Sequence, residues 1–282
     1  YGEIKPLLSL FIDVKGLFDF DRRLKLLKVK SNKGNTYYIP VKPGDKDGEI
    51  VDVRRPFGIE AYSDLPSLRG LKVLIRGKTS DNYGVMEVFD KKVYDKLKIT
   101  KDDVILDLGG NIGVFNRWAY TQGASKVISF EPDKRYFELL SMNSDERSIL
   151  FNAAISNEIS TIDLYESNHL GGSNIFGSNT TITNHYKVRT YTLDYLFETN
   201  LIDRIDFLKV DIEGAEILAL QGISDHNLSK VKNISVEYHH AHLNYDEELR
   251  NNFITRLNRL GFNSYLLFCG DNNNLQLIYF YK

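Results

Sequence analysis

The sequence predicts an α/β protein with a mostly parallel, twisted sheet covered by helices on both faces. Short apolar strands alternate with amphipathic helices from about residue 104 onward. Strands that are apolar on both faces are typical of a buried parallel sheet. A glycine-rich turn joins the first of these strands to its helix, at the edge where open α/β sheets bind ligands.

Residues 1–70 form the first expected unit, a small accessory region. Five of the six prolines of the chain fall in it, and its hydrophobic periodicity is poor. Such a pattern favours short strands and loops. Residues 71–282 form the second unit, which carries the main α/β domain.

The second unit opens with a short strand over 71–75 and an amphipathic helix. The helix is predicted by apolar side chains at helical spacing, Met86, Phe89, Val93 and Leu97. The alternating elements then follow, with strands over 104–108, 126–130, 149–153, 205–210 and 234–236 and helices over 114–122 and 133–143. The last two strands, 265–268 and 275–281, flank a Gly-Asp-Asn-Asn-Asn turn, which favours an antiparallel hairpin at the sheet edge.

Charge and composition exclude several classes of function. Thirty-six basic and thirty-eight acidic residues give a net charge of −2, so no global positive field attracts nucleic acid. Cys269 is the single cysteine, which excludes an intramolecular disulfide and a thiolate zinc cage and favours the cytoplasm. The sequence contains no apolar run of about 18 residues, the length that would predict a membrane-spanning helix. The chain begins with Tyr1, so we expect it to be part of a longer multidomain protein.

The strand-to-helix turn over 107–113 reads Asp-Leu-Gly-Gly-Asn-Ile-Gly. Its glycines allow close backbone approach to a ligand. Asn111 occupies the place of the second glycine of a dinucleotide fingerprint, so that motif fails. A carboxylate at Asp107 would repel a pyrophosphate and attract an ammonium and a sulfonium. This charge argument selects S-adenosylmethionine as the ligand.

Two further strand ends support a nucleoside. Glu131 ends the second strand, where an acidic side chain accepts ribose hydroxyls in both nicotinamide and methyl-donor proteins. Asn152 and Ala153 end the third strand, where backbone amides and a small side chain would flank an adenine. A glycine-rich turn without a ligand is the plainer interpretation of the loop alone.

Several motifs in order resemble the FkbM-type S-adenosylmethionine-dependent methyltransferases, from about Ile75 to Tyr238. They are Arg-Gly-Lys-Thr-Ser-Asp (76–81), Glu-Val-Phe (87–89), the 107–113 loop, Phe-Glu-Pro-Asp (130–133), Asn-Ala-Ala-Ile (152–155), Thr-Tyr-Thr-Leu-Asp (190–194) and Ile-Asp-Phe-Leu-Lys-Val-Asp-Ile-Glu-Gly-Ala-Glu (205–216). Gly110 stands where the family often has Ala, and the first seventy residues match nothing in the family.

The resemblance implies a Rossmann-like methyltransferase fold and methylation of a hydroxyl. It implies that the donor contacts Ser80, Asp81, Asp107, Gly109, Gly110, Asn111, Gly113, Glu131, Pro132, Asn152, Ala153 and Asp211. It does not fix the acceptor, which in the family is commonly a sugar or a natural product.

Lys209, Asp211 and Glu213 alternate at the end of the 205–210 strand and are our first catalytic candidates. They would point to one side if the extended conformation persists. Burying an unpaired charge is costly, so charged groups cluster at a buried strand end when they pair with one another or act on a ligand. The alternative is that Lys209 neutralises Asp211 and that Glu213 and Glu216 stabilise the following helix through its dipole, which we favour for Glu216.

His239 ends the next strand, and we expect it to be a general base, because its neutral form accepts a proton near pH 7. Glu237, His239 and His240 are expected to contact the acceptor. We expect no metal. A divalent ion on Asp211, Glu237 and His239 is a weaker alternative, since this is no zinc pattern. His240 and His242 otherwise belong to a solvated loop.

A polar insertion contains Gly172, Ser173 and Asn174 and would cover the acceptor as a mobile loop, or else only link two hairpin strands. The leading hypothesis is an O-methyltransferase of a sugar hydroxyl in a glycan or glycoconjugate. A natural-product or lipid-linked acceptor is the alternative. A nicotinamide-dependent oxidoreductase and a donor-binding module without turnover are more distant ones.

Overall fold

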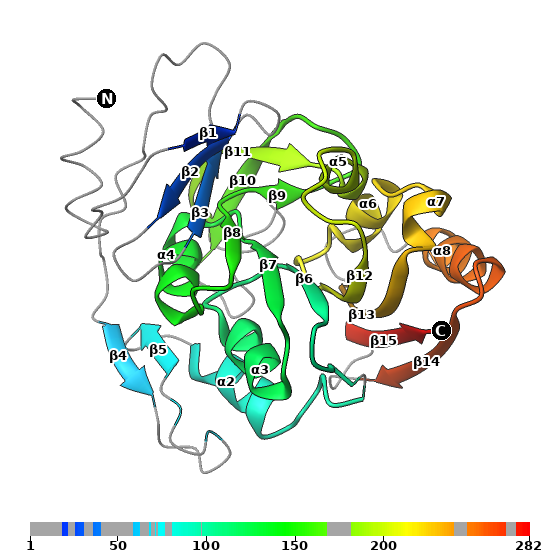
Figure 1. Ribbon diagram of the computed structural model, residues 1–282, viewed down its shortest axis with the longest axis horizontal. Helices are drawn as coiled ribbons and strands as arrows, with labels where there is room; N and C mark the ends of the chain where they lie inside the picture. The colour runs from blue at the N-terminus through cyan, green and yellow to red at the C-terminus, as the bar shows by residue number, and fades with distance from the viewer. Residues whose placement is uncertain are drawn as a thin grey trace.

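The computed structural model describes residues 19–21, 26–30, 36–40, 59–62, 68, 71, 73–76, 81–96, 98–167, 182–239, 247–268 and 275–282. Its centre is a ten-stranded sheet of order β1-β2-β3-β8-β7-β6-β12-β13-β15-β14 (Figure 1). The predicted α/β class with a mostly parallel sheet is confirmed. No helix in these ranges is long and apolar enough to cross a membrane.

Five parallel strands form the middle of this sheet. They are β8 (Ile149–Phe151), β7 (Lys126–Phe130), β6 (Val104–Leu108), β12 (Ile205–Val210) and β13 (Val231–His239). Their side chains are buried on both faces, as their near-continuous apolar sequence predicts. The carboxyl ends of β6, β7, β12 and β13 therefore meet at one edge, which positions the site.

Helices cover the two faces of the sheet (Figure 1). They are α2 (Asp81–Phe89), α3 (Val114–Gln122), α4 (Lys134–Asn143), α5 (Leu193–Glu198), α6 (Glu216–Gln221), α7 (Asp225–Leu228) and α8 (Glu247–Arg259). One core cluster packs α2 and α3 on the sheet, and another packs α5, α6 and α8. The start of α4 is capped by Asp133, whose carboxylate accepts the Arg135 N–H at 2.8 Å.

The chain ends in the predicted hairpin. Strands β14 (Asn263–Phe268) and β15 (Leu275–Tyr281) are antiparallel, and β15 also pairs antiparallel with β13. At the opposite edge β3 (Thr36–Pro40) pairs parallel with β8 and is followed outward by β2 (Leu26–Lys30) and β1 (Asp19–Asp21). Strands from residues 1–70 thus extend the central sheet, and the boundary at residue 70 stays a prediction.

Two smaller sheets flank the main one. Strands β4 (Ile59–Tyr62) and β5 (Val73–Arg76) pair with each other. Strands β10 (Thr161–Ser167), β11 (Ile182–Tyr191) and β9 (Ala154–Ile155) form the other sheet. The predicted 149–153 strand is therefore too long, because the chain leaves the central sheet after Phe151 and pairs with β11 instead.

The first predicted helix is also too long. Helix α2 ends at Phe89, so Val93 and Leu97 lie beyond it. Lys92 adopts a φ of 55°, a left-handed conformation that an α-helix cannot continue through. Val93 lies in a turn after α2 and packs against the same core cluster as the helix. Its apolar side chain therefore reflects burial and not a continued helix.

Candidate functional site

A pocket of about 720 Å³, part of it open to solvent, lies at the carboxyl ends of β6, β7 and β12. The predicted donor residues Gly109, Asn111, Glu131, Pro132, Ala153 and Asp211 line it, together with Glu213. Apolar side chains complete its wall, among them Phe130, Ile155 and Ile162. Seven of the sixteen described residues that line this pocket were thus predicted as site residues.

The glycine turn that follows β6 forms the floor of the pocket. Gly109 has a φ of 83°, and a Cβ there would stand 1.8 Å from the backbone oxygen of Asp211. Only glycine fits, because the loop after β6 packs directly on the loop after β12. Asn111 is also left-handed, with a φ of 47°. Its backbone N–H donates to the Glu131 carboxylate at 2.8 Å.

Glu131 is 7% exposed and has its two carboxylate oxygens fixed by different backbone amides. Oε2 accepts from Asn111 N–H, and Oε1 accepts from Asp133 N–H at 2.8 Å. Burial is the largest influence and, with the nearby Asp133 carboxylate, raises the pKa of Glu131 to about 8. The remaining lone pairs of this carboxylate are available to hydroxyl donors in the pocket.

Asp107 does not line the pocket, which corrects the expectation that its charge faces a ligand. It is fully buried, with Oδ1 lying 3.1 Å from Lys209 Nζ and Oδ2 accepting from the Ser129 hydroxyl. Asp107 and Lys209 are opposite each other in the β6–β12 register. The cation that neutralises Asp107 thus comes from the neighbouring strand, which the sequence motif alone did not reveal.

Lys209 is 4% exposed and has several acceptors around its ammonium group. Nζ donates to the backbone oxygen of Gly109 at 2.8 Å and lies 3.3 Å from Asp211 Oδ2. The two carboxylates hold the pKa of Lys209 above its usual range despite burial, which alone would lower it. Lys209 therefore anchors the glycine loop and β12 to each other, and its predicted catalytic role is not favoured by this placement.

The extended conformation does not persist to Glu213. β12 ends at Val210, and Glu213 and Gly214 adopt φ values of 56° and 100°. This left-handed turn brings the Glu213 carboxylate into the pocket wall and leads into α6. Burial is the largest influence that raises the pKa of Glu213 to about 8, and Asp211 and Glu216 add to the rise.

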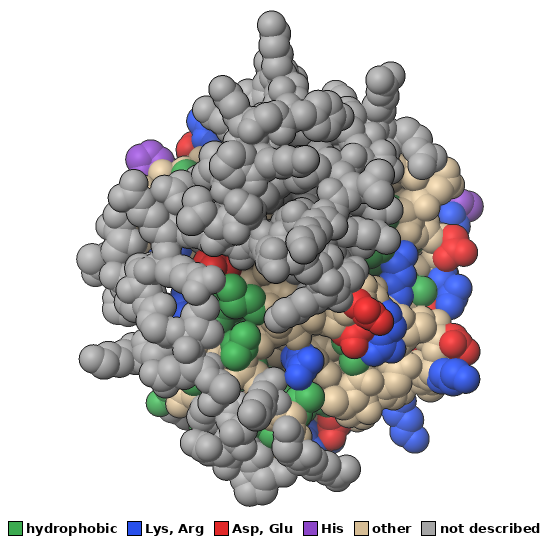
Figure 2. All heavy atoms as spheres, turned by 60° about the vertical axis from the view of Figure 1, so that its left-hand side comes forward, with side chains coloured by type: hydrophobic (Ala, Val, Ile, Leu, Met, Phe, Trp, Pro, Cys, Tyr) green, Lys and Arg blue, Asp and Glu red, His purple; other side chains and the backbone are tan. Residues whose placement is uncertain are grey.

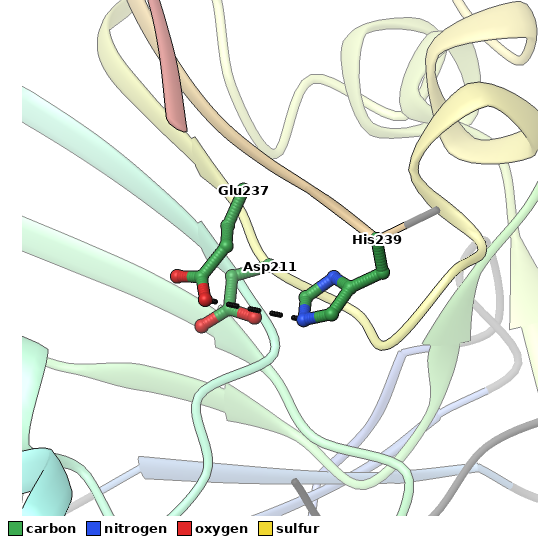
Figure 3. Close-up of side chains that lie close together, drawn as sticks. All are labelled: Asp211, Glu237 and His239. Atoms are coloured by element: carbon green, nitrogen blue, oxygen red, sulfur yellow. Dashed lines mark ion pairs between the residues drawn. The ribbon is translucent and has the colours of Figure 1, made fainter. Parts of the chain in front are cut away.

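Asp211, Glu237 and His239 point toward one another from the ends of β12 and β13 (Figure 3). One potential ligand atom of each lies within 4.8 Å of the others. His239 Nε2 is 3.9 Å from Glu237 Oε1 and 3.6 Å from Glu213 Oε2. The residues of the weaker metal alternative are thus close together in space, although the ammonium of Lys209 already lies beside Asp211.

Carboxylates outnumber cations around this cluster. Burial and nearby Asp211 raise the pKa of Glu237 well above its usual range, and the same two causes raise that of Glu87 on α2. Burial lowers the pKa of His239, but Glu216, Glu213 and Asp211 outweigh it and raise that pKa well above 6.5. A cationic ligand would relieve this repulsion.

Several predicted residues lie away from the pocket lining. The Asn152 side chain donates to the backbone oxygens of Glu131 and Pro132 and so fixes the end of β7. Asp81 pairs with Arg76 at 2.6 Å. Gly110 and Gly113 shape the turn beneath the pocket and pack on Leu140 of α4. Ser80, Gly172, Ser173, Asn174 and His240 lie outside the described residues.

Besides the apolar wall, Tyr136 and Glu216 belong to the site and were not predicted as site residues. Tyr136 lines the pocket, and the Arg76 guanidinium lies 4.1 Å from the centre of its ring. Glu216 is fully buried and contacts His239, whereas the sequence favoured only a helix-start role. The sequence signal for Tyr136 was its place in the first turn of α4, five residues after Glu131. No local signal linked Glu216 to a histidine that follows it by 23 residues.

The outer surface is mixed in charge. Figure 2 shows Lys or Arg and Asp or Glu side chains interspersed over the described part of one face. This agrees with the net charge of −2. The described part of this face therefore provides no broad positive field for a phosphate backbone.

Comparisons with known proteins match this chain to methyltransferases. The family described as "Methyltransferase FkbM domain" matches residues 107–264, which contain the glycine turn, Glu131, Asp211 and His239. A hexuronic acid methyltransferase, AglP of Haloferax volcanii, is 28% identical over 142 residues, covering 49% of this chain and 57% of that protein. Methyltransferase 1 of Beauveria bassiana is 27% identical over 177 residues, covering 54% of this chain and 70% of that protein.

A much longer protein and a solved structure also match. The AMB antimetabolite synthetase AmbE of Pseudomonas aeruginosa is 28% identical over 218 residues, covering 62% of this chain, which spans only 10% of that protein. A solved FkbM methyltransferase from Methylobacillus flagellatus aligns with 66% of this chain and 45% of its own at 18% identity, with a TM-score of 0.47. A likeness this distant says nothing about the reaction.

Proposed function

Because the chain belongs to the FkbM methyltransferase family, we propose that it moves the methyl group of S-adenosylmethionine to a hydroxyl of a sugar in a glycan or glycoconjugate. The observation that carries this proposal is the charge of the pocket. Its described lining contains three carboxylates, Glu131, Asp211 and Glu213, and no Lys, Arg or His. Burial raises the pKa of Glu131 and Glu213 to about 8, and a cationic nucleoside beside them would favour their ionised form, whereas a diphosphate would oppose it.

The residues present fit such a donor. Glu131 offers a carboxylate with fixed oxygens for ribose hydroxyls, and Ala153, Ile155 and Ile162 offer apolar wall for a base. Asp211 and Glu213 provide negative charge for the ammonium and sulfonium groups. When bound, S-adenosylmethionine supplies a methyl carbon whose bond to sulfur breaks with its electron pair left on sulfur.

The residues of this chain contribute in two ways: they position the acceptor, and one of them takes its proton. An acceptor oxygen held in line with the methyl carbon forms the new carbon–oxygen bond, and His239 Nε2 takes the hydroxyl proton. Fixing the two reactants removes much of the entropic barrier. A correctly placed base contributes on the order of 10²–10⁴-fold. Glu237, from the same strand as His239, is our candidate to accept a hydrogen bond from the acceptor.

The sugar acceptor is supported by the relative named as a hexuronic acid methyltransferase. The antimetabolite synthetase supports the natural-product alternative. A nicotinamide-dependent oxidoreductase receives no support from the family match, and the acidic pocket opposes its diphosphate.

The test is incubation of the protein with isotopically labelled S-adenosylmethionine and two acceptor panels, neutral and uronic sugars in one and peptide or polyketide hydroxyls in the other. Mass spectrometry then measures the 14 Da gain expected for a methyl group. Methylated sugar supports the proposal. Methylation only in the second panel assigns the natural-product alternative. Binding of S-adenosylhomocysteine with no turnover on either panel assigns a non-catalytic donor-binding module.

A further inference from the structure

We propose that Glu216 is a positioning residue, which holds His239 so that Nε2 faces the reacting groups. The inference rests on the proposed function, in which His239 is the base. His239 Nδ1 lies 2.9 Å from Glu216 Oε1. The contact joins the first residue of α6 to the last residue of β13.

Glu216 is held more firmly than a helix-start role requires. Its Oε1 accepts from the backbone N–H groups of Gly214, at 2.9 Å, and Ile212, at 3.3 Å. The residue is fully buried, although a carboxylate can stabilise a helix start through its dipole from an exposed position. Burying a carboxylate costs free energy unless hydrogen bonds or an opposite charge compensate it. The left-handed turn at Glu213 and Gly214 directs those two amides to the same oxygen.

This contact decides which imidazole nitrogen is free. A carboxylate only accepts hydrogen bonds, so Nδ1 carries the proton and the neutral ring has its lone pair on Nε2. Nε2 is the atom that lies 3.6 Å from Glu213 Oε2, at the pocket wall. An imidazole held in the other tautomer would present an N–H to the acceptor and could not take its proton.

Several charged groups face His239 and together set its protonation. Glu216, Glu213 and Asp211 come from the β12–α6 segment, and Glu237 comes from its own strand. Glu87 faces it from α2. Lys209, beside Asp211, is the nearby cation. Of these groups, Glu216 alone contacts Nδ1 in the described part of the chain, so removing it changes the tautomer and the charge together.

Two variants separate these effects. In Glu216→Gln the amide oxygen takes the place of Oε1, because Gly214 and Ile212 N–H both donate there. The variant keeps the Nδ1–H acceptor and loses the negative charge. Glu216→Ala loses both. Glu198→Gln is the matched control, an exposed glutamate at the end of α5.

The first readout is ¹⁵N NMR of labelled histidine, with the His239 signals assigned by their loss in His239→Asn. We expect the neutral ring of wild type and Glu216→Gln to be protonated on Nδ1, and that of Glu216→Ala to lose this preference. An Nε2–H tautomer in the wild type would overturn the proposal. This measurement needs no acceptor, so it stands even if the proposed reaction fails.

The second readout is the pH dependence of kcat. Protonated His239 cannot accept a proton, so activity rises as pH climbs through its pKa. Removing the Glu216 charge lowers that pKa, and we expect the acidic limb of Glu216→Gln to move about 1–3 units toward lower pH. In Glu216→Ala we expect kcat to fall about 10- to 100-fold, with the KM for the donor unchanged. A uniform loss in both variants, with the limb unmoved, would show a merely structural role.

Discussion

The two sides of the pocket differ in how their carboxylates are satisfied. On the donor side, Asp107 pairs with Lys209, and each oxygen of Glu131 accepts a backbone N–H. On the side of His239, Glu213 and Glu237 lie 3.6 and 3.9 Å from its Nε2 atom and have raised pKa values. The donor side is thus ordered by the chain itself, whereas the carboxyl groups beside His239 repel one another when ionised, and a cationic ligand would favour their ionised forms.

Among the substitutions on the donor side, we expect Gly109→Ala to have the largest effect. Its φ of 83° costs about 1–2 kcal/mol for a residue with a Cβ, and the clash with the Asp211 backbone oxygen adds to that cost. We expect loss of the folded state or at least a hundredfold loss of S-adenosylhomocysteine affinity, measured by denaturant unfolding and calorimetry.

Gly261→Ala is the matched control for this prediction. Gly261 has a φ of 86°, and a Cβ there meets nothing within 4 Å. It should show the conformational cost alone, with donor affinity unchanged. Equal effects at the two positions would show that the close approach of the two loops is not what Gly109 provides.

Lys209→Met tests the buried pair of the donor side. It leaves the fully buried Asp107 without its cation, and we expect the free energy of unfolding to fall by about 3–5 kcal/mol. Lys187→Met breaks the exposed pair with Asp163 and should cost less than about 1 kcal/mol. Adding Asp107→Asn to Lys209→Met should recover stability. A double variant no more stable than the single one would contradict the pairing.

The pH dependence of nucleoside binding tests Glu131. The neutral probe 5′-methylthioadenosine carries the ribose without ammonium or carboxylate groups. The ionised form of Glu131 is the stronger acceptor, so affinity should rise about fivefold as pH passes upward through about 8. Glu131→Gln should bind weakly with this rise removed. A rise that persists in Glu131→Gln would assign it to another group, such as Glu213.

Metal removal is expected to have the smallest effect. The ammonium of Lys209 already lies 3.3 Å from Asp211, and the proposed reaction uses His239 Nε2 as the base. Treatment with EDTA should change kcat less than twofold. A large loss that Mg²⁺ or Mn²⁺ restores would instead make Asp211, Glu237 and His239 metal ligands.

The sequence predicted the strands and helices of the fold more accurately than it predicted which charged side chains pair with each other. Strands such as β6 and helices such as α3 were predicted at their observed bounds, because local periodicity and glycine punctuation determine them. The pairing of Asp107 with Lys209 depends on strand register across a hundred residues, which no local pattern encodes. The contact between Glu216 and His239 likewise depends on how α6 packs on β13.

A crystal structure with S-adenosylhomocysteine tests the central claim, an acidic pocket made for a cationic methyl donor, most directly. We predict the ribose hydroxyls within hydrogen-bond distance of Glu131 and the sulfur on the side of Asp211 and His239. A nucleoside bound away from Glu131, or a sulfur remote from His239, would contradict the account.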